Sequence, residues 1–226
     1  MFIGHFGIGF GSKAAAPGAS LGSLFLASQF IDLLWPTLLV LGIERVNIVP
    51  GATKVTPLEF AYYPISHSLL AVLFWALLVA GIYHLLRRYP RGTLVLGLAV
   101  VSHWVLDAVV HRPDLPLYPG SSYLVGFGLW SSLWGTIVIE LLIFGIGVGL
   151  YLRTTEAVDN TGVWAFWILV VLLIFIYLGN VFGSPPPNVT ALAWIGEAQW
   201  ILILWGYWID RHRRIVEING VRRTGM

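Results

Sequence analysis

The chain has 226 residues, of which 58% are hydrophobic and 11% are charged, and its formal net charge is +2. A mean hydropathy of +0.82 excludes an ordinary soluble domain of this length and indicates a protein that lies in a bilayer. The absence of cysteine excludes disulfides, thiolate metal ligands and cysteine nucleophiles. The sparse positive charges form no basic patch, so nucleic acid is not an expected partner.

The N-terminal segment 2–15 is apolar but too short to cross the hydrocarbon core of a bilayer. It lacks the positively charged region and the small-residue cleavage site of a signal peptide, so we expect it to remain in the mature protein. Pro17 and Gly18 separate it from the next apolar segment. We therefore expect a re-entrant or half-inserted helix here.

Six longer segments stay mainly apolar for about 20 residues, which is the length of helix that crosses a bilayer. These segments are residues 18–43, 65–86, 93–110, 131–152, 162–182 and 190–209. The composition does not change along the chain in a way that would mark a second domain. The sequence therefore predicts an all-α polytopic membrane protein, with about six transmembrane helices and the short N-terminal helix in a single domain, 1–226.

Arginines gather after the second, fourth and sixth predicted spans. They are Arg87, Arg88, Arg91, Arg153, Arg211, Arg213, Arg214, Arg222 and Arg223. The opposite loops carry only Arg45, Lys54 and Arg112 as positive charges. Because positive residues favour the cytoplasmic side, this asymmetry predicts a multi-pass protein of a bacterial-type inner (plasma) membrane, with its C-terminus in the cytoplasm.

The first two apolar segments are expected to form a hairpin that turns at Pro17 and Gly18. Such a hairpin returns His5 to about the height of Asp32. Pro36 has no N–H to donate to the carbonyl of Asp32, so the helix should kink there and leave a free backbone acceptor. The following loop, 44–64, is long enough to form a small cap.

The third span carries His103, Asp107 and His111 at positions i, i+4 and i+8, which share one face of a helix. His67 opens the second span at the same outer level. Ionisable groups inside a span cost roughly 2.5 to 3.5 kcal/mol each, so several together require a compensating partner. An interhelical hydrogen bond is the structural alternative for the His103–Asp107 pair, and a metal ion is the functional one.

A chain without cysteine must hold a metal ion with imidazole and carboxylate groups. We expect a divalent metal site, with zinc as the default and manganese or iron as alternatives. The predicted ligands are His5, Asp32, His67, His103 and Asp107, with His111 as a further candidate.

Other polar groups also fall in the outer halves of their spans, namely Glu140, Asn180 and Glu197. The inner halves are almost purely apolar, which indicates a one-sided cup and not a path across the membrane. Glu140 is either a buried, hydrogen-bonded carboxyl group or a proton-transfer group. The glycine pairs Gly7/Gly11 and Gly145/Gly149 have the spacing that permits close helix contacts.

The residues Gly4-His5, Asp32, Ser66-His67-Ser68 and Ser102-His103 to Asp107 resemble the motifs of the YdjM-like family, described as inner-membrane metal-dependent hydrolases. The resemblance covers roughly 1–120, and the order of His and Asp is also distantly similar to zinc-dependent phospholipase C. It implies a metal-site half, 1–120, followed by accessory transmembrane helices, 121–226.

The chain departs from the family pattern at two motifs. Residues 29–33 stand where the family tends to have Pro-Asp-x-Asp-His, and residues 62–67 stand where it tends to have His-Arg-Gly-x-Thr-His. These departures leave open whether the site is binuclear, mononuclear, or completed by His111 or Glu140.

Our leading hypothesis is a hydrolase that acts on an amphiphilic, lipid-like phosphoester or ester from the non-cytoplasmic side. Arg112 would clamp a phosphate and Asp114 or Glu140 would transfer protons, although an arginine just outside a span more often anchors to lipid headgroups. One alternative is a non-enzymatic, metal-stabilised module that binds a lipid or a partner protein. A transporter and an iron-dependent lipid oxidase are further alternatives, and the apolar inner halves argue against transport.

Overall fold

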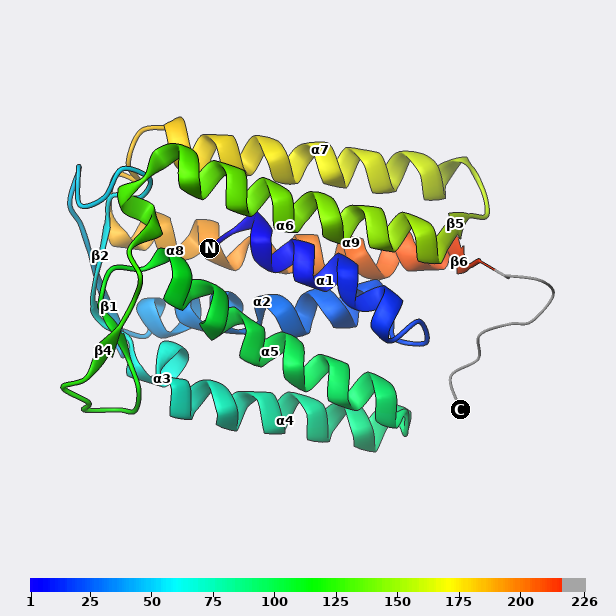
Figure 1. Cartoon of the computed structure of the whole chain (residues 1–226), viewed down its shortest axis with the longest axis horizontal. Helices are drawn as coiled ribbons and strands as arrows, with labels where there is room; N and C mark the ends of the chain where they lie inside the picture. The colour runs from blue at the N-terminus through cyan, green and yellow to red at the C-terminus, as the bar shows by residue number, and fades with distance from the viewer. Residues whose placement is uncertain (217–226) are drawn as a thin grey trace.

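The computed structural model describes residues 1–216, and its regular structure is mainly helical (Figure 1). The helices are α1 (Ile3–Ala15), α2 (Leu21–Val40), α3 (Pro64–His67), α4 (Leu69–Arg87), α5 (Pro90–Val110), α6 (Leu133–Thr154), α7 (Asn160–Phe182), α8 (Val189–Glu197) and α9 (Gln199–Arg211), with a 3-10 turn, η1 (Leu129–Ser131). Three antiparallel strand pairs join β1 (Arg45–Ile48) to β2 (Leu58–Tyr62), β3 (Leu115–Pro116) to β4 (Leu124–Val125), and β5 (Thr155–Ala157) to β6 (Arg213–Ile215).

Within residues 1–216, six helical segments are long and apolar enough to cross a membrane. They are α2, α4, α5, α6, α7 and the pair α8–α9, which is interrupted at Ala198. All six predicted spans are therefore confirmed, with their ends shifted by a few residues. Segment 2–15 forms α1, whose 13 residues are too few to span the core. The protein is thus an all-α, multi-pass membrane protein.

Polar side chains fix where most of the long helices begin. In five helices the residue before the first turn accepts a hydrogen bond from the backbone N–H three positions later. These residues are Ser20, Ser68, Ser132, Asp159 and Asn188, at the starts of α2, α4, α6, α7 and α8. Each cap satisfies a donor that the helix itself leaves unpaired.

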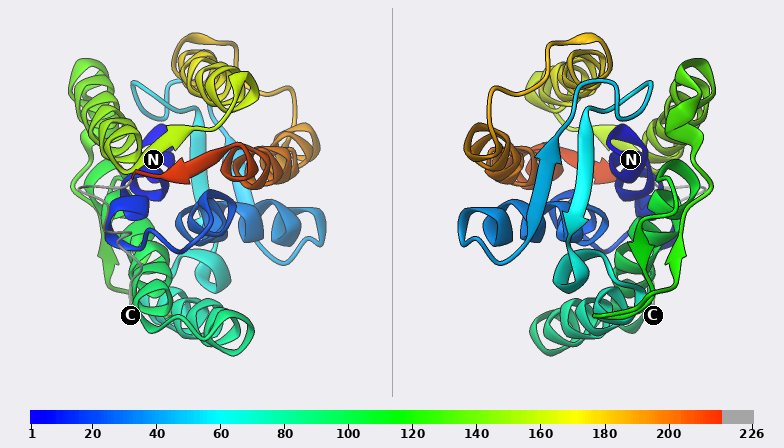
Figure 2. Two further views of the ribbon diagram at one scale, coloured as in Figure 1. Left: turned by 90° about the vertical axis from the view of Figure 1, so that its right-hand side faces the viewer. Right: turned by 90° about the vertical axis from the view of Figure 1, so that its left-hand side faces the viewer.

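The strand pairs and short turns mark the two ends of the bundle. The β1–β2 and β3–β4 pairs and α3 lie together at one end, and β5–β6 lies at the other (Figures 1 and 2). The predicted cap in loop 44–64 is therefore the β1–β2 hairpin. The predicted cytoplasmic arginines lie at the β5–β6 end, except that Arg222 and Arg223 lie outside the described residues.

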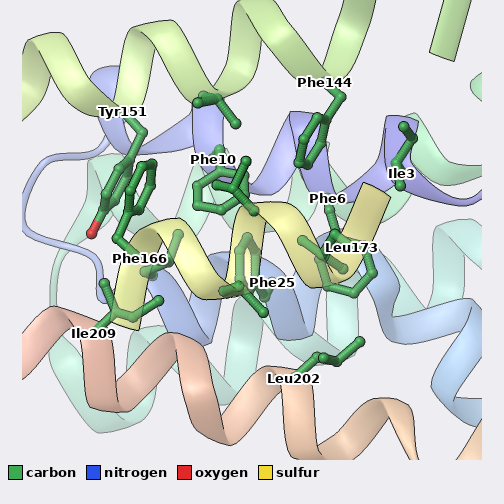
Figure 3. Close-up of a cluster of buried hydrophobic side chains, with 14 of the residues drawn as sticks. Ile3, Phe6, Phe10, Phe25, Phe144, Tyr151, Phe166, Leu173, Leu202 and Ile209 are labelled. Atoms are coloured by element: carbon green, nitrogen blue, oxygen red, sulfur yellow. The ribbon is translucent and has the colours of Figure 1, made fainter. Parts of the chain in front are cut away.

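Aromatic side chains fill the bundle around α1 (Figure 3). Phe10 is packed edge-on against Phe25, Phe144, Tyr151 and Phe166, with ring centres 4.8 to 6.0 Å apart. Lipid tails are as apolar as these rings, so close van der Waals packing, and not transfer from water, stabilises the contacts between the helices. The short first helix is therefore held by neighbours from both halves of the chain.

The backbones of α1 and α6 approach each other most closely at two glycines. A Cβ added to Gly7 would lie 2.8 Å from the carbonyl oxygen of Ile143, and one added to Gly147 would collide with the carbonyl oxygen of Gly7. Gly147 was not among the pairs chosen by spacing. Gly145 and Gly149 have no described atom within 4 Å of an added Cβ, because they lie on other faces of α6.

We expect Gly147→Ala to destabilise the protein by roughly 1–3 kcal/mol, because the added methyl group meets backbone atoms that cannot move independently. Gly145→Ala is the matched control on the same helix. It should leave stability unchanged or raise it by up to about 1 kcal/mol, since alanine is the better helix former. Thermal unfolding of the purified protein in detergent measures both effects, and equal midpoints for the two variants would contradict the close α1–α6 contact.

Candidate metal centre

Four helices bring histidine and aspartate side chains to one point near the β1–β2 end of the bundle. The potential ligand atoms of His5, His103 and Asp107 lie within 4.8 Å of one another, and so do those of Asp32, His67 and His103. Because His103 belongs to both groups, the five residues form one continuous set, here called the His/Asp cluster. It contains five of the six predicted metal ligands.

The two carboxylates lie between the imidazole rings. His103 Nε2 is 3.2 Å from Asp107 Oδ2 and 3.5 Å from Asp32 Oδ1. His67 Nε2 is 3.7 and 3.8 Å from the same two oxygens. His5 Nε2 is 3.2 Å from Asp107 Oδ1, and its ring stacks on that of His103 with 3.7 Å between the centres. Three Nε2 atoms therefore face two carboxylates.

A backbone contact determines which nitrogen of His103 carries hydrogen. Its Nδ1 lies 2.9 Å from the carbonyl oxygen of Ser28, which can only accept, so Nδ1 must donate. In the neutral ring, Nε2 then presents a lone pair to Asp32 and Asp107. Lone pairs and carboxylate oxygens repel one another unless a proton or a metal cation lies between them. His103 Nε2 has no hydrogen-bond partner within the described chain.

The cluster is enclosed on most sides. The side chains of His5, His67, His103 and Asp107 are 0–3% exposed, whereas that of Asp32 is 21% exposed. Burial strengthens electrostatic interactions and raises the cost of an unpaired charge. Asp32 therefore marks the side from which a solute reaches the cluster.

Residues at the α8–α9 junction contact α2 beside Asp32. Because Pro36 lacks an N–H, the carbonyl of Asp32 is free, as expected, and Gln199 Nε2 donates to it at 3.4 Å. Gly196 packs against the Pro36 ring so closely that a Cβ there would lie 2.5 Å from Pro36 Cγ. The last span thus packs closely against α2 beside Asp32.

The structure places His111 next to the cluster but outside both ligand groups. Its Nδ1 lies 2.8 Å from Asp114 Oδ1, and its ring centre is 6.5 Å from that of His67. His111 is the C-cap of α5, and its backbone N–H still bonds to the Asp107 carbonyl at 2.8 Å, so it ends the helical stripe while its ring contacts Asp114. Asp114 also accepts a 2.8 Å hydrogen bond from the Tyr63 hydroxyl group.

Arg112 and Glu140, two of the predicted catalytic residues, also lie outside the cluster. Arg112 is 40% exposed and pairs with Glu59 at 3.1 Å and Asp114 at 3.4 Å. Glu140 is buried and accepts hydrogen bonds from the backbone N–H groups of Phe2 at 2.8 Å and Gly4 at 3.3 Å. These are unpaired donors at the start of α1, so Glu140 caps that helix and holds its first turn, which carries His5.

Sequence reasoning missed Glu44, a buried residue just after α2. Its carboxylate accepts hydrogen bonds from Ile65 N, Ser66 N and Ser66 Oγ at 2.5 to 2.9 Å. Burial raises the pKa of Glu44, while the Ser66 and Ile65 donors act in the opposite direction. Sequence periodicity cannot identify a single acidic residue in a loop. The available signal is the position of Glu44 shortly after an apolar span, which is a reason to look for a buried hydrogen-bond partner.

Comparison with known proteins identifies one family. No curated protein and no solved structure matches the chain. The model of the YdjM inner membrane protein family matches residues 63–183, more than half of the chain. This region contains His67, His103 and Asp107 but starts after His5 and Asp32, so it begins later and ends later than the expected 1–120. The family description names a membrane and no reaction, and the chain belongs to the YdjM inner membrane protein family.

Proposed function

We propose that this protein is a membrane-embedded, metal-dependent hydrolase that acts on an amphiphilic, lipid-like phosphoester or ester from the non-cytoplasmic side. The observation that carries the proposal is the His/Asp cluster, in which three imidazole Nε2 atoms face the buried carboxylate of Asp107 and the partly exposed one of Asp32. A divalent cation would remove the repulsion between the Nε2 lone pair of neutral His103 and the carboxylates of Asp32 and Asp107. Asp32, the partly exposed member, supplies the open side that a catalytic site requires.

The donor set fits zinc, which binds imidazole nitrogen and carboxylate oxygen and in catalytic sites uses three protein ligands. The ligands would come from His5, Asp32, His67, His103 and Asp107. Manganese and iron accept the same donors. When bound, such an ion supplies Lewis acidity and lowers the pKa of a water molecule to about 7.

The residues around the cluster would orient the histidine rings and exclude bulk water. The Ser28 carbonyl holds the ring of His103, and the buried walls keep bulk water away from the histidines. Asp114 is the group best placed to pass protons, because it contacts both His111 and the Tyr63 hydroxyl group. Arg112 is partly exposed and is proposed to contact a phosphate at the outer end.

The side of action follows from the two ends of the bundle. The cluster lies toward the β1–β2 end, and the arginines lie at the β5–β6 end. We infer that the arginine end, with the C-terminus, faces the cytoplasm. Phe10 follows His5 along α1, away from the β1–β2 end, and the aromatic core around it fills the bundle (Figure 3), which argues against a transport path.

A metal-stabilised module that binds a lipid or a partner protein is the second candidate. The observation in its favour is the burial of four cluster members, since a structural metal is fully ligated by protein. Both candidates predict that the protein binds a metal ion, but only the hydrolase predicts that a substrate is cleaved.

Purified wild-type protein should bind Zn²⁺, and His103→Ala should weaken that binding by more than about 100-fold, because changes outside the ligand shell alone cost 10–100-fold. His84→Ala, an exposed histidine at the far end of α4, is the control and should bind as the wild type does. Equilibrium competition with a zinc-binding dye measures the affinity. A wild type that binds no more zinc than His103→Ala would remove the basis of the proposal.

Hydrolysis is tested with vesicles that contain headgroup-labelled and acyl-labelled phospholipids. The zinc-loaded wild type should release label, and Asp107→Asn should reduce release to the rate without protein, since Asp107 contacts all three histidines of the cluster. Glu156→Gln, an exposed residue at the opposite end, should not change the rate. Zinc-loaded protein that releases neither label supports the module instead.

A further inference from the structure

Glu44 is a buried acid that reaches the His/Asp cluster through a neighbouring serine. The residue is 2% exposed. One carboxylate oxygen, Oε1, accepts from the backbone N–H groups of Ile65 at 2.7 Å and Ser66 at 2.9 Å. The other, Oε2, lies 2.5 Å from Ser66 Oγ. Three donors therefore converge on this one carboxylate.

The end of α2 explains how Glu44 arrives there. Gly42 has φ +69°, a left-handed conformation that glycine adopts readily after the last helical turn. The backbone N–H groups of Ile43 and Glu44 then bond to the carbonyl of Leu38, which turns the chain back. This turn places Glu44 against α3, the single helical turn that carries Ser66 and His67.

With Glu44 ionised, the hydrogen bonds set the direction of the protons in this chain of contacts. Ser66 Oγ also lies 2.7 Å from His67 Nδ1. A hydroxyl group has one hydrogen, and a carboxylate only accepts, so Ser66 donates to Glu44 and accepts from His67 Nδ1–H. Neutral His67 must then carry its lone pair on Nε2, the atom that faces Asp32 and Asp107 at 3.8 and 3.7 Å.

We infer that Glu44 is a positioning residue for the metal centre. Through Ser66 it selects the His67 tautomer whose Nε2 lone pair points into the His/Asp cluster. The inference rests on the proposed function, because the tautomer matters only if the cluster holds a cation. Ser66 would then do for His67 what the Ser28 carbonyl does for His103: Nδ1 donates a hydrogen bond, and Nε2 is left as the ligand.

A purely structural role for Glu44 is the competing explanation, since its Oε1 caps the first turn of α3. Two variants separate the roles. In Glu44→Gln, the amide oxygen must keep accepting from Ile65 N and Ser66 N, so the NH₂ group faces Ser66 Oγ as a donor. Ser66 would then donate to His67 Nδ1, which moves the imidazole hydrogen to Nε2. Ser66→Ala removes only the hydroxyl group and leaves both backbone hydrogen bonds to Glu44 in place.

The experiment measures Zn²⁺ affinity by competition and the unfolding midpoint for wild type, Glu44→Gln, Ser66→Ala and Glu59→Gln. Glu59 is the matched control, an exposed acid on β2 that contacts Asn47 and Arg112. We expect both Glu44→Gln and Ser66→Ala to bind zinc 10–100-fold more weakly, the range typical of groups that orient a ligand. Glu59→Gln should bind as the wild type does.

Nitrogen-15 chemical shifts of His67 in the metal-free protein should report hydrogen on Nδ1 in the wild type and on Nε2 in Glu44→Gln.

The outcomes separate this inference from the proposed function. Wild-type zinc affinity in Ser66→Ala and Glu44→Gln, together with a loss in His103→Ala, would overturn the role of Glu44 and leave the metal centre in place. If Glu44→Gln does not fold, Ser66→Ala alone decides, because the structural role predicts unchanged affinity for it. A wild type that binds no zinc would end both proposals.

Discussion

Two aspartates and three histidines are buried together in a chain that spans a bilayer, and the arrangement of the site depends on compensating the two carboxylates. Asp107 lies within 3.7 Å of a nitrogen from His5, His67 and His103, and the amino nitrogen of Met1 is 2.6 Å from its Oδ1. Several kcal/mol per uncompensated ion is the usual cost of such burial. Two of the three imidazoles come from short elements: His5 lies on the re-entrant α1, and His67 lies on the single turn of α3.

The delivery of His5 depends on the second half of the chain. α1 has no side-chain cap of its own among the described residues, and Glu140 of α6 supplies one. The glycine contact between Gly7 and Gly147 lets the two backbones approach, which a larger residue would prevent. The division into a metal-site half, 1–120, and accessory helices, 121–226, remains a prediction, and α6 contributes across it because Glu140 caps the helix that carries His5.

Hydrophobic length and shared helix faces were enough to predict the six spans, the half-inserted helix and five residues of the cluster. These features are local, since one stretch of apolar residues or one i, i+4 pair determines each of them. Glu44 could not be predicted, because its position depends on the turn at Gly42 and on a partner about 20 residues away. His111 was expected on the helical stripe and does end it as the C-cap of α5, but its Nδ1 contacts Asp114 and it belongs to neither group of potential ligands, which spacing alone does not show. Spacing likewise indicated Gly145, whereas the contact uses Gly147, since small-residue spacing does not say which face of α6 meets α1.

The last span has a more specific role than closing the bundle. Asp32 is the most exposed member of the cluster, and a contact from the last span supports its backbone. Pro36 frees the Asp32 carbonyl, and Gln199 at the start of α9 binds it, directly after the interruption at Ala198 that separates α8 from α9. The interruption in the sixth span and the proline in the first therefore lie side by side, and the Gln199–Asp32 hydrogen bond and the Gly196–Pro36 contact join the two spans next to the most exposed member of the cluster.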